Sequence, residues 1–190
     1  MRLIGLHGRA GAGKDTIAAK LIAEHNYGRM ALAGPLKDML ITGLREVGVS
    51  RQVLDDRHLK EQVLPAIGKS PRELMQTLGT EWGRQLVCDD LWLKIAQVHL
   101  QYHARYLSGL VITDVRFDNE ANWVRAQGGE IWHVLRKFPD NVTPLHLSEY
   151  GIEMHAGIDS VIVNDAGLEQ LKDQVRAAFA GELRIAQASA

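Results

Sequence analysis

The sequence has a single cysteine, no long apolar run and no excess of charge of either sign. One thiol, Cys88, cannot form an internal disulfide, which excludes the small secreted folds that disulfides stabilise. No apolar run approaches the ~18–20 residues of a membrane-spanning helix, and glycines interrupt the apolar start of the chain too early for a signal peptide. We therefore expect a cytoplasmic protein that has no membrane partner.

The charged residues nearly balance, with 22 Lys and Arg against 23 Asp and Glu and a net charge of −1. Proteins that bind nucleic-acid polymers usually carry a strong basic excess, so we expect no such partner. The chain has 190 residues, of which 46% are hydrophobic, and this is enough to bury one core of ordinary size. We expect a single domain over residues 1–190.

Short apolar runs alternate with helical patterns along the chain. The runs at 2–7, 110–114, 131–135 and 161–163 are apolar on both faces, which is typical of buried parallel strands. Apolar residues at helical spacing follow at 17–26, 36–47, 71–82, 91–107, 118–127 and 168–179, whereas 48–69 is a polar surface excursion. This alternation predicts an α/β fold, a parallel sheet with helices on both faces.

The segment GRAGAGKDT, residues 8–16, lies between the first expected strand and the first expected helix. It fits the phosphate-binding pattern G-x-x-x-x-G-K, in which glycines let backbone N–H groups surround a phosphate and the lysine reaches the β- and γ-phosphates. Its strand–loop–helix context is the one that the motif requires. We expect the whole loop to contact ATP, through Gly8, Arg9, Ala10, Gly11, Ala12, Gly13, Lys14, Asp15 and Thr16.

Two carboxylates are candidates for a Mg²⁺ site. Asp15 stands where the motif usually has a Ser or Thr hydroxyl on the metal, and a carboxylate can bind the ion directly or through water. Asp114 ends an expected strand, where an acid can hold the magnesium shell. Arg116 lies two residues further on, where the chain leaves the carboxyl edge of the sheet and where ligands of such sheets bind. An arginine at this place can bind a phosphate with two hydrogen bonds.

Together with four further stretches, the phosphate loop and its Lys-Asp-Thr ending resemble the deoxynucleoside monophosphate kinases of bacteriophages. These stretches follow in order at 33–37 (AGPLK), 70–79 (SPRELMQTLG), 114–121 (DVRFDNEA), and 146–149 (HLSE) with 163–165 (VND). The resemblance covers roughly residues 2–175. It implies a P-loop kinase core with a mobile substrate-binding and lid part, and Mg²⁺-dependent transfer of the γ-phosphoryl group of ATP to a deoxynucleoside monophosphate in the cytoplasm of the host.

The resemblance also implies roles for single residues and segments. Lys14, Arg116, Asp114 and Arg9 would act in catalysis. A helical excursion over about 36–107 would bind the substrate. The side chains that would contact the acceptor nucleotide are Lys37, Arg72, Arg116, Glu120 and Arg136.

A lid is expected over about 137–159, yet Lys137 is its one basic residue besides histidines. We therefore expect Arg9, Arg116 and Arg136 to carry the transition-state charge instead of a set of lid arginines.

Two other functions and one assembly stay open at this level. A kinase of another small acceptor, such as dephospho-coenzyme A, would share the loop and the core. A nucleotide-hydrolysing switch protein would share the loop, although the guanine-binding pattern Asn-Lys-x-Asp of switch GTPases is absent. The sequence is compatible with a homodimer.

Overall fold

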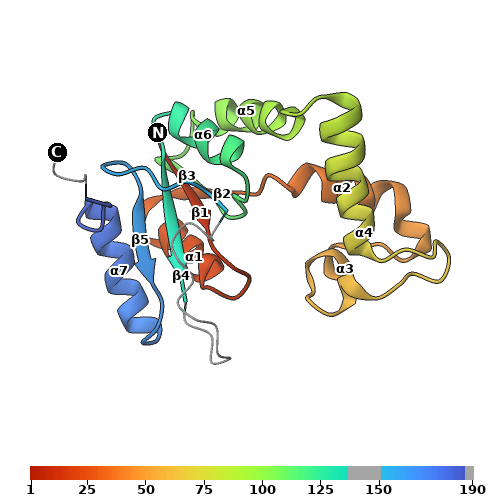
Figure 1. Cartoon of the computed structure of the whole chain (residues 1–190), viewed down its shortest axis with the longest axis horizontal. Coiled ribbons are helices and arrows are strands. Elements are labelled where there is room, and N and C mark those ends of the chain that lie inside the picture. The colour runs from red at the N-terminus through yellow and green to blue at the C-terminus, as the bar shows by residue number, and fades with distance from the viewer. Residues whose placement is uncertain (137–150, 187–190) are drawn as a thin grey trace. The chain divides into compact units, whose positions relative to one another are not determined.

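The computed structural model describes residues 1–136 and 151–186 (Figure 1). The chain divides into two compact units. The core unit comprises Met1–Ala31 and Leu100–Ala190, and the helical unit comprises Leu32–His99. The expected excursion of 36–107 therefore spans most of the helical unit and the first residues of the core unit's second segment.

The core unit is built on five parallel strands. Their order across the sheet is β2-β3-β1-β4-β5. Their bounds are β1 (Arg2–His7), β2 (Tyr27–Met30), β3 (Gly109–Ile112), β4 (Glu130–Leu135) and β5 (Ser160–Val163). Because β1 lies between β3 and β4, the loop that leaves β1 and the loop that leaves β3 start side by side at the carboxyl edge.

Helices cover both faces of this sheet. They are α1 (Lys14–His25), α6 (Asp118–Ala126) and α7 (Leu168–Ala180). On one face, Leu6 of β1 packs in a fully buried cluster with Ile17 of α1 and Leu171 of α7. On the other face, a Cβ at Gly5 would meet Val124 of α6, so that helix lies close against the strand. The predicted α/β fold with helices on both faces is confirmed.

The edge strand β2 is absent from the elements that the sequence predicts. Its four residues read Tyr-Gly-Arg-Met, and only the first and the last are buried. A four-residue edge strand with a polar middle carries too few apolar positions to show a period of two. Pairing with β3, from Tyr27 with Gly109 to Met30 with Ile112, defines the strand.

The helical unit contains α2 (Gly34–Leu44), η1 (Arg45–Val47), α3 (Arg51–Asp55), η2 (Leu59–Glu61), α4 (Pro71–Gln76) and η3 (Thr77–Val87), and α5 (Leu91–His103) runs from it into the core unit. The short pieces between 48 and 69 are those that the polar sequence predicts. At the start of α4, Ser70 Oγ accepts from the Glu73 N–H at 3.2 Å and Glu73 Oε2 accepts from the Ser70 N–H at 2.8 Å. This reciprocal cap stabilises the first turn.

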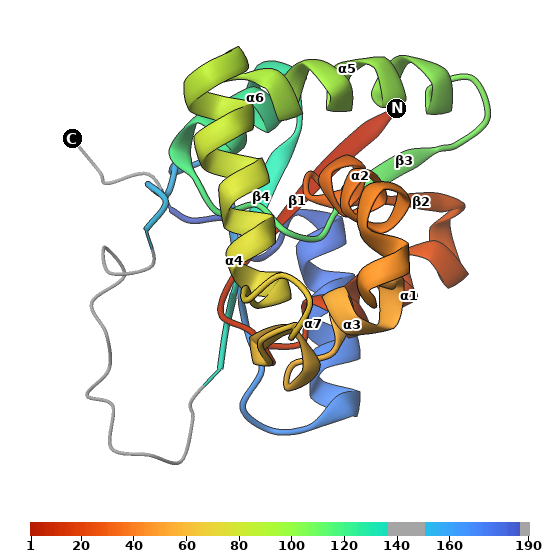
Figure 2. The same ribbon diagram turned by 90° about the vertical axis from the view of Figure 1, so that its right-hand side faces the viewer.

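The helix that begins as α4 continues to Val87 as a wider π-type helix (Figure 2). Two buried glycines, Gly79 and Gly83, lie against the indole of Trp92. Trp92 Nε1 donates to the Gly79 carbonyl at 2.8 Å, and a Cβ at Gly83 would stand 2.6 Å from the indole. The absence of a Cβ at Gly83 therefore lets the tryptophan approach the helix backbone, which outweighs the low helix propensity of glycine.

None of the described helices combines the length and the hydropathy that crossing a membrane requires.

Candidate functional site

The loop between β1 and α1 has the backbone shape that a phosphate loop needs. Gly8, Gly11 and Gly13 all have positive φ, at 151°, 82° and 110°, a region that favours glycine. A Cβ at Gly8 would stand 2.4 Å from the carbonyl oxygen of Val134, so a larger residue would push the loop off β4. The loop ends at the N-terminus of the twelve-residue α1, where backbone N–H groups and the helix dipole favour an anion.

Lys14 lies in the first turn of α1, and its ammonium group turns back into the loop. Its Nζ donates to the carbonyls of Gly8 at 2.7 Å and Arg9 at 2.9 Å. Burial lowers the pKa of Lys14, and nearby Arg116 lowers it further, whereas Asp15 and Asp114 act in the opposite direction. Four charged groups that the sequence separates by up to 102 positions thus interact at one place.

Asp15, the unusual acid of the loop, is held by an ion pair. Its Oδ1 accepts from Arg29 Nη2 of β2. The Asp15 side chain is 81% exposed, which leaves the carboxylate accessible to an ion from solvent. Arg29 is a residue that the sequence did not single out, because its strand was not predicted.

The chemistry of the carboxylates fits Mg²⁺. Asp15 and Asp114 are carboxylates that act electrostatically on Lys14, and Mg²⁺ is usually bound by one or two carboxylates together with phosphate oxygens and waters. Within residues 1–136 and 151–186, no group of three or more His, Cys, Asp or Glu forms an all-protein metal site.

A hollow of about 350 Å³ adjoins the loop. It is lined by Gly11, Gly13, Lys14, Asp15, Thr16, Arg136, Asn164, Gly167, Leu168 and Leu171. Arg136 Nη1 donates to the Gly11 carbonyl at 3.0 Å, so this predicted contact lies against the loop. Asn164 Nδ2 donates to the Ala12 carbonyl at 2.8 Å and closes the far side of the loop.

The two acceptor candidates of the helical unit both carry an acidic partner. Lys37 Nζ contacts Asp55 Oδ1 at 2.6 Å, and Arg72 Nε contacts Glu61 Oε1 at 2.5 Å. Arg72 and Glu61 are about half exposed, at 53% and 49%. Exposed pairs of this kind contribute at most ~1 kcal/mol to stability, so the fold does not depend on Arg72.

Comparisons with known proteins decide the family. A model of the deoxynucleotide monophosphate kinase family matches residues 67–175, more than half of the chain. A protein of Acanthamoeba polyphaga mimivirus that is assigned as a deoxynucleotide monophosphate kinase is 30% identical, over 92% of this chain and 94% of its own. The chain belongs to the deoxynucleotide monophosphate kinase family. The predicted family and the phosphotransferase class are thereby confirmed.

Other relatives of this kinase are phage proteins. The deoxynucleotide monophosphate kinase of Enterobacteria phage T4 is 26% identical over 93% of this chain and 98% of its own. The deoxynucleoside-5'-monophosphate kinase of Escherichia phage T5 is 28% identical over 65% and 71%. A crystal structure of a protein assigned as a kinase, from Chloroflexus aurantiacus, has a TM-score of 0.51 at 11% identity and covers 95% of this chain and 94% of its own. That last likeness concerns the fold alone.

Glu120, which the resemblance assigns to the acceptor nucleotide, lies inside this kinase. It is 5% exposed, and its Oε2 accepts from the backbone N–H groups of Arg116 at 2.8 Å and Phe117 at 3.3 Å. These contacts cap the start of α6, where Asp118 is the first helical residue. The role in substrate binding stays a prediction, whereas the contacts are those of a backbone support.

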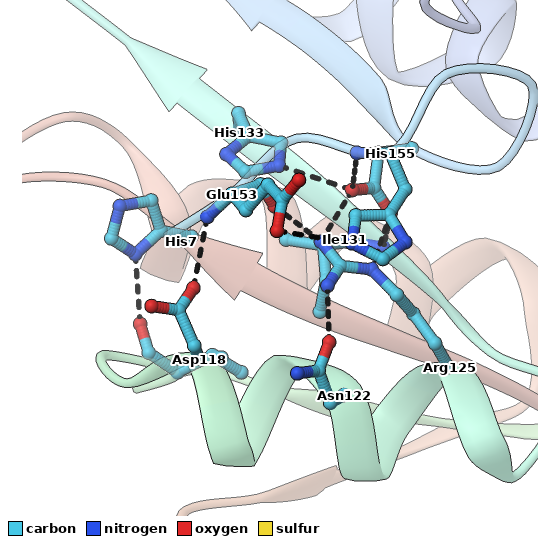
Figure 3. Close-up of polar contacts among 10 residues, drawn as sticks. His7, Asp118, Asn122, Arg125, Ile131, His133, Glu153 and His155 are labelled. Atoms are coloured by element: carbon cyan, nitrogen blue, oxygen red, sulfur yellow. Dashed lines mark hydrogen bonds and ion pairs between the residues drawn. The ribbon is translucent and has the colours of Figure 1, made fainter. Parts of the chain in front are cut away.

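A buried carboxylate, that of Asp159, has four partners in the core unit, which Figure 3 labels: Arg125, Ile131, His133 and His155. Asp159 is 0% exposed and accepts from Arg125 Nη2 at 2.6 Å, the His155 N–H at 2.8 Å and the Ile131 N–H at 3.0 Å. His133 Nε2 lies 3.4 Å from the same carboxylate. Burial by itself would raise the pKa of Asp159, but the hydrogen bonds outweigh it and hold the pKa far below 3.8.

This network also holds the end of the predicted lid. Arg125 Nη2 donates to the Glu153 carbonyl at 2.6 Å, and the Glu153 N–H donates to Asp118 Oδ1 at 2.9 Å. The backbone N–H and carbonyl groups of Glu153 thus both contact side chains of α6, and these contacts hold residues 151–159 against the helix (Figure 3). The remaining lid positions, 137–150 with Lys137, lie outside the described residues.

Asn164 could have been found from the sequence, and Asp159 could not. Asn164 directly follows β5 at the carboxyl edge of the sheet, where ligands of open α/β sheets bind, and the sequence analysis applied this rule to Arg116. Asp159 precedes its strand and acts through Arg125, 34 positions away, for which no local pattern exists.

Proposed function

We propose that this kinase transfers the γ-phosphoryl group of ATP to the phosphate of a deoxynucleoside monophosphate, with Lys14, Asp15, Asp114 and Arg116 forming the transfer site. One observation carries the proposal: these four charged groups interact beside a glycine loop at a helix N-terminus. The acceptor phosphate is already anionic at neutral pH, so the reaction needs no general base. Alignment and charge neutralisation then supply most of the catalysis.

Each residue has a distinct part in this scheme. The loop N–H groups and Lys14 hold the donor phosphates, and the adjoining hollow of about 350 Å³ takes the rest of the donor nucleotide. Arg116 and Arg136 neutralise charge that grows on the group in transfer, with Arg9 beside them. Asp15 and Asp114 would hold Mg²⁺, which would supply positive charge that offsets the negative charge of the donor phosphates.

The direct experiment is a coupled assay of ADP formation with each common deoxynucleoside and ribonucleoside monophosphate as acceptor. We expect ADP to form at least ~100-fold faster with a good deoxynucleoside monophosphate than with no acceptor. Equal rates with and without acceptor would instead indicate a nucleotide hydrolase. If ADP forms with dephospho-coenzyme A as acceptor but not with any nucleoside monophosphate, the protein is a kinase of that other small acceptor.

Arg72→Ala tests the acceptor side. We expect the KM for the deoxynucleoside monophosphate to rise about tenfold or more, which corresponds to ~1.4 kcal/mol, while the KM for ATP changes little. Glu61→Gln is the matched control, because it removes the partner's charge and leaves Arg72 in place. An Arg72→Ala variant that weakens ATP and acceptor alike, or neither, would contradict an acceptor site at this residue.

Asp15 variants test the metal side. Asp15→Ser keeps an oxygen that can bind Mg²⁺ and Asp15→Ala does not, so we expect the Mg²⁺ concentration for half-maximal activity to rise more in Asp15→Ala. Titration calorimetry should show that Mg²⁺ strengthens ATP binding less in Asp15→Ala than in Asp15→Ser. If the two variants have identical Mg²⁺ dependence in both measurements, Asp15 is not a metal ligand.

We also propose a cellular setting and an assembly for this kinase. The phage origin of several relatives supports nucleotide supply in an infected host's cytoplasm as the setting. Self-association into a homodimer is also proposed, and the mass of the protein in solution, measured by light scattering, tests it.

A further inference from the structure

The peptide group between Val115 and Arg116 is held from both sides. Its carbonyl oxygen lies 3.0 Å from His7 Nδ1, and its N–H donates to Glu120 Oε2 at 2.8 Å. His7 is 8% exposed and Glu120 is 5% exposed, so water competes little for either contact. One peptide plane is thereby fixed by two buried side chains.

The donor in the first contact follows from chemistry. A carbonyl oxygen can only accept a hydrogen bond, so His7 Nδ1 carries the proton and donates. Glu120 in turn accepts from two consecutive N–H groups at the start of α6, where the helix dipole favours a carboxylate. Both contacts require one particular orientation of the peptide group, and that orientation sets the direction in which the Arg116 side chain leaves the backbone.

His7 also connects Arg116 with the phosphate loop. It is the last residue of β1, directly before Gly8, whereas Val115 follows β3, the strand paired with β1. Figure 3 shows the His7 ring with its contact running toward the turn before α6. This hydrogen bond therefore couples the base of the loop to the peptide group of Arg116.

We infer that His7 and Glu120 are positioning residues that hold Arg116 in register with the phosphate loop. The inference rests on the proposed function, because it takes Arg116 as the clamp on the transferred phosphoryl group. A misplacement of about 1 Å at such a group can cost about 100-fold in rate, mainly in kcat, since the clamp acts most strongly in the transition state. The positioning role also explains why Glu120 is buried, although it lies in a stretch that resembles substrate-binding sequence.

Side-chain replacements at His7 separate positioning from general packing. The amide nitrogen of Asn stands close to the place of Nδ1, that of Gln stands one bond further out, and Leu offers no donor. We expect His7→Asn to keep kcat within about threefold, and His7→Gln and His7→Leu to lower kcat about tenfold or more, with the KM for ATP nearly constant. Glu120→Ala removes the acceptor of the Arg116 and Phe117 N–H groups, so we expect this variant also to lower kcat about tenfold or more.

A double-mutant cycle with Arg116→Ala completes the test. Once Arg116 is removed, His7→Leu and Glu120→Ala should lower kcat no further, because there is no side chain left to orient. Effects that multiply independently in the double variants would overturn the inference and leave the proposed function intact. So would equal kcat values for His7→Asn, His7→Gln and His7→Leu.

The proposed function has its own separate outcome. If Arg116→Ala leaves kcat unchanged, Arg116 is not the phosphate clamp, and the inference about His7 and Glu120 is wrong as well. ADP formation by the unaltered enzyme would still test the overall activity. Thermal unfolding of each variant shows which ones are folded at the assay temperature. If His7→Leu unfolds, the comparison between His7→Asn and His7→Gln, two amides of similar polarity, decides the inference alone.

Discussion

Replacing Lys14 with alanine is expected to lower kcat by about 10²–10⁴-fold, or ~3–5 kcal/mol of transition-state stabilisation. The ammonium group lies in the loop within hydrogen-bond distance of two loop carbonyls and next to Arg116, Asp15 and Asp114. It is thus the group best placed to follow charge as it moves from the donor to the transferred phosphoryl group. Steady-state kinetics with a good acceptor measure the loss.

Lys172→Ala is the matched control for this change. Lys172 lies on α7, 36% exposed and paired with Glu169 at 2.6 Å, so its removal deletes one lysine from the core unit outside the loop. We expect its kcat to stay within about twofold of the unaltered enzyme, as is usual for exposed ion pairs. If Lys14→Ala keeps similar activity, the assignment of residues 8–16 as the phosphate loop is wrong.

Asp159→Asn is expected to lower the free energy of unfolding by about 3–5 kcal/mol. The Arg125 side chain is 7% exposed, and its charge would lose a fully buried partner. For a chain of this length the loss corresponds to a decrease of roughly 6–20 °C in Tm. Asp173→Asn is the control, since Asp173 pairs with Arg176 at 2.7 Å on an exposed helix surface, and equal Tm shifts would contradict the buried anchor.

The pH dependence of this effect has a definite sign. The pKa of Asp159 is lowered in the folded state, so its charge contributes stability that is complete above 3.8 and is lost as the pH falls from there toward the folded value. The Tm difference between the unaltered enzyme and Asp159→Asn should therefore stay constant from about pH 7 to 5 and begin to narrow near pH 4. A difference that already narrows between pH 7 and 6 would contradict a lowered pKa of Asp159 as its cause.

Residues close in sequence were those that the sequence predicted well. The phosphate loop of 8–16 has its own strand, glycines and helix within about twenty-five residues, and the cap between Ser70 and Glu73 spans three positions. Contacts over such short separations depend on backbone preferences that each residue carries with it. The buried strands and amphipathic helices were visible for the same reason, since burial imposes a period on a continuous stretch.

Three features were decided only by the tertiary structure. Strand β2 exists because β3 offers it a hydrogen-bonding edge, and Gly83 is needed because Trp92 packs onto its helix. His7 Nδ1 contacts the carbonyl oxygen of Val115, 108 positions away in the sequence.

The sequence by itself determined the kinase family and the position of its phosphate loop between a strand and a helix, because each of these motifs consists of contiguous residues. The tertiary structure decided how Arg116 is held and what anchors 151–159, with Glu120 and Asp159 buried against backbone N–H groups. The sequence shows that a residue is Asp or Glu, but not whether its carboxylate contacts a substrate or a backbone peptide group. Only the fold determines which donors surround it, and therefore its role.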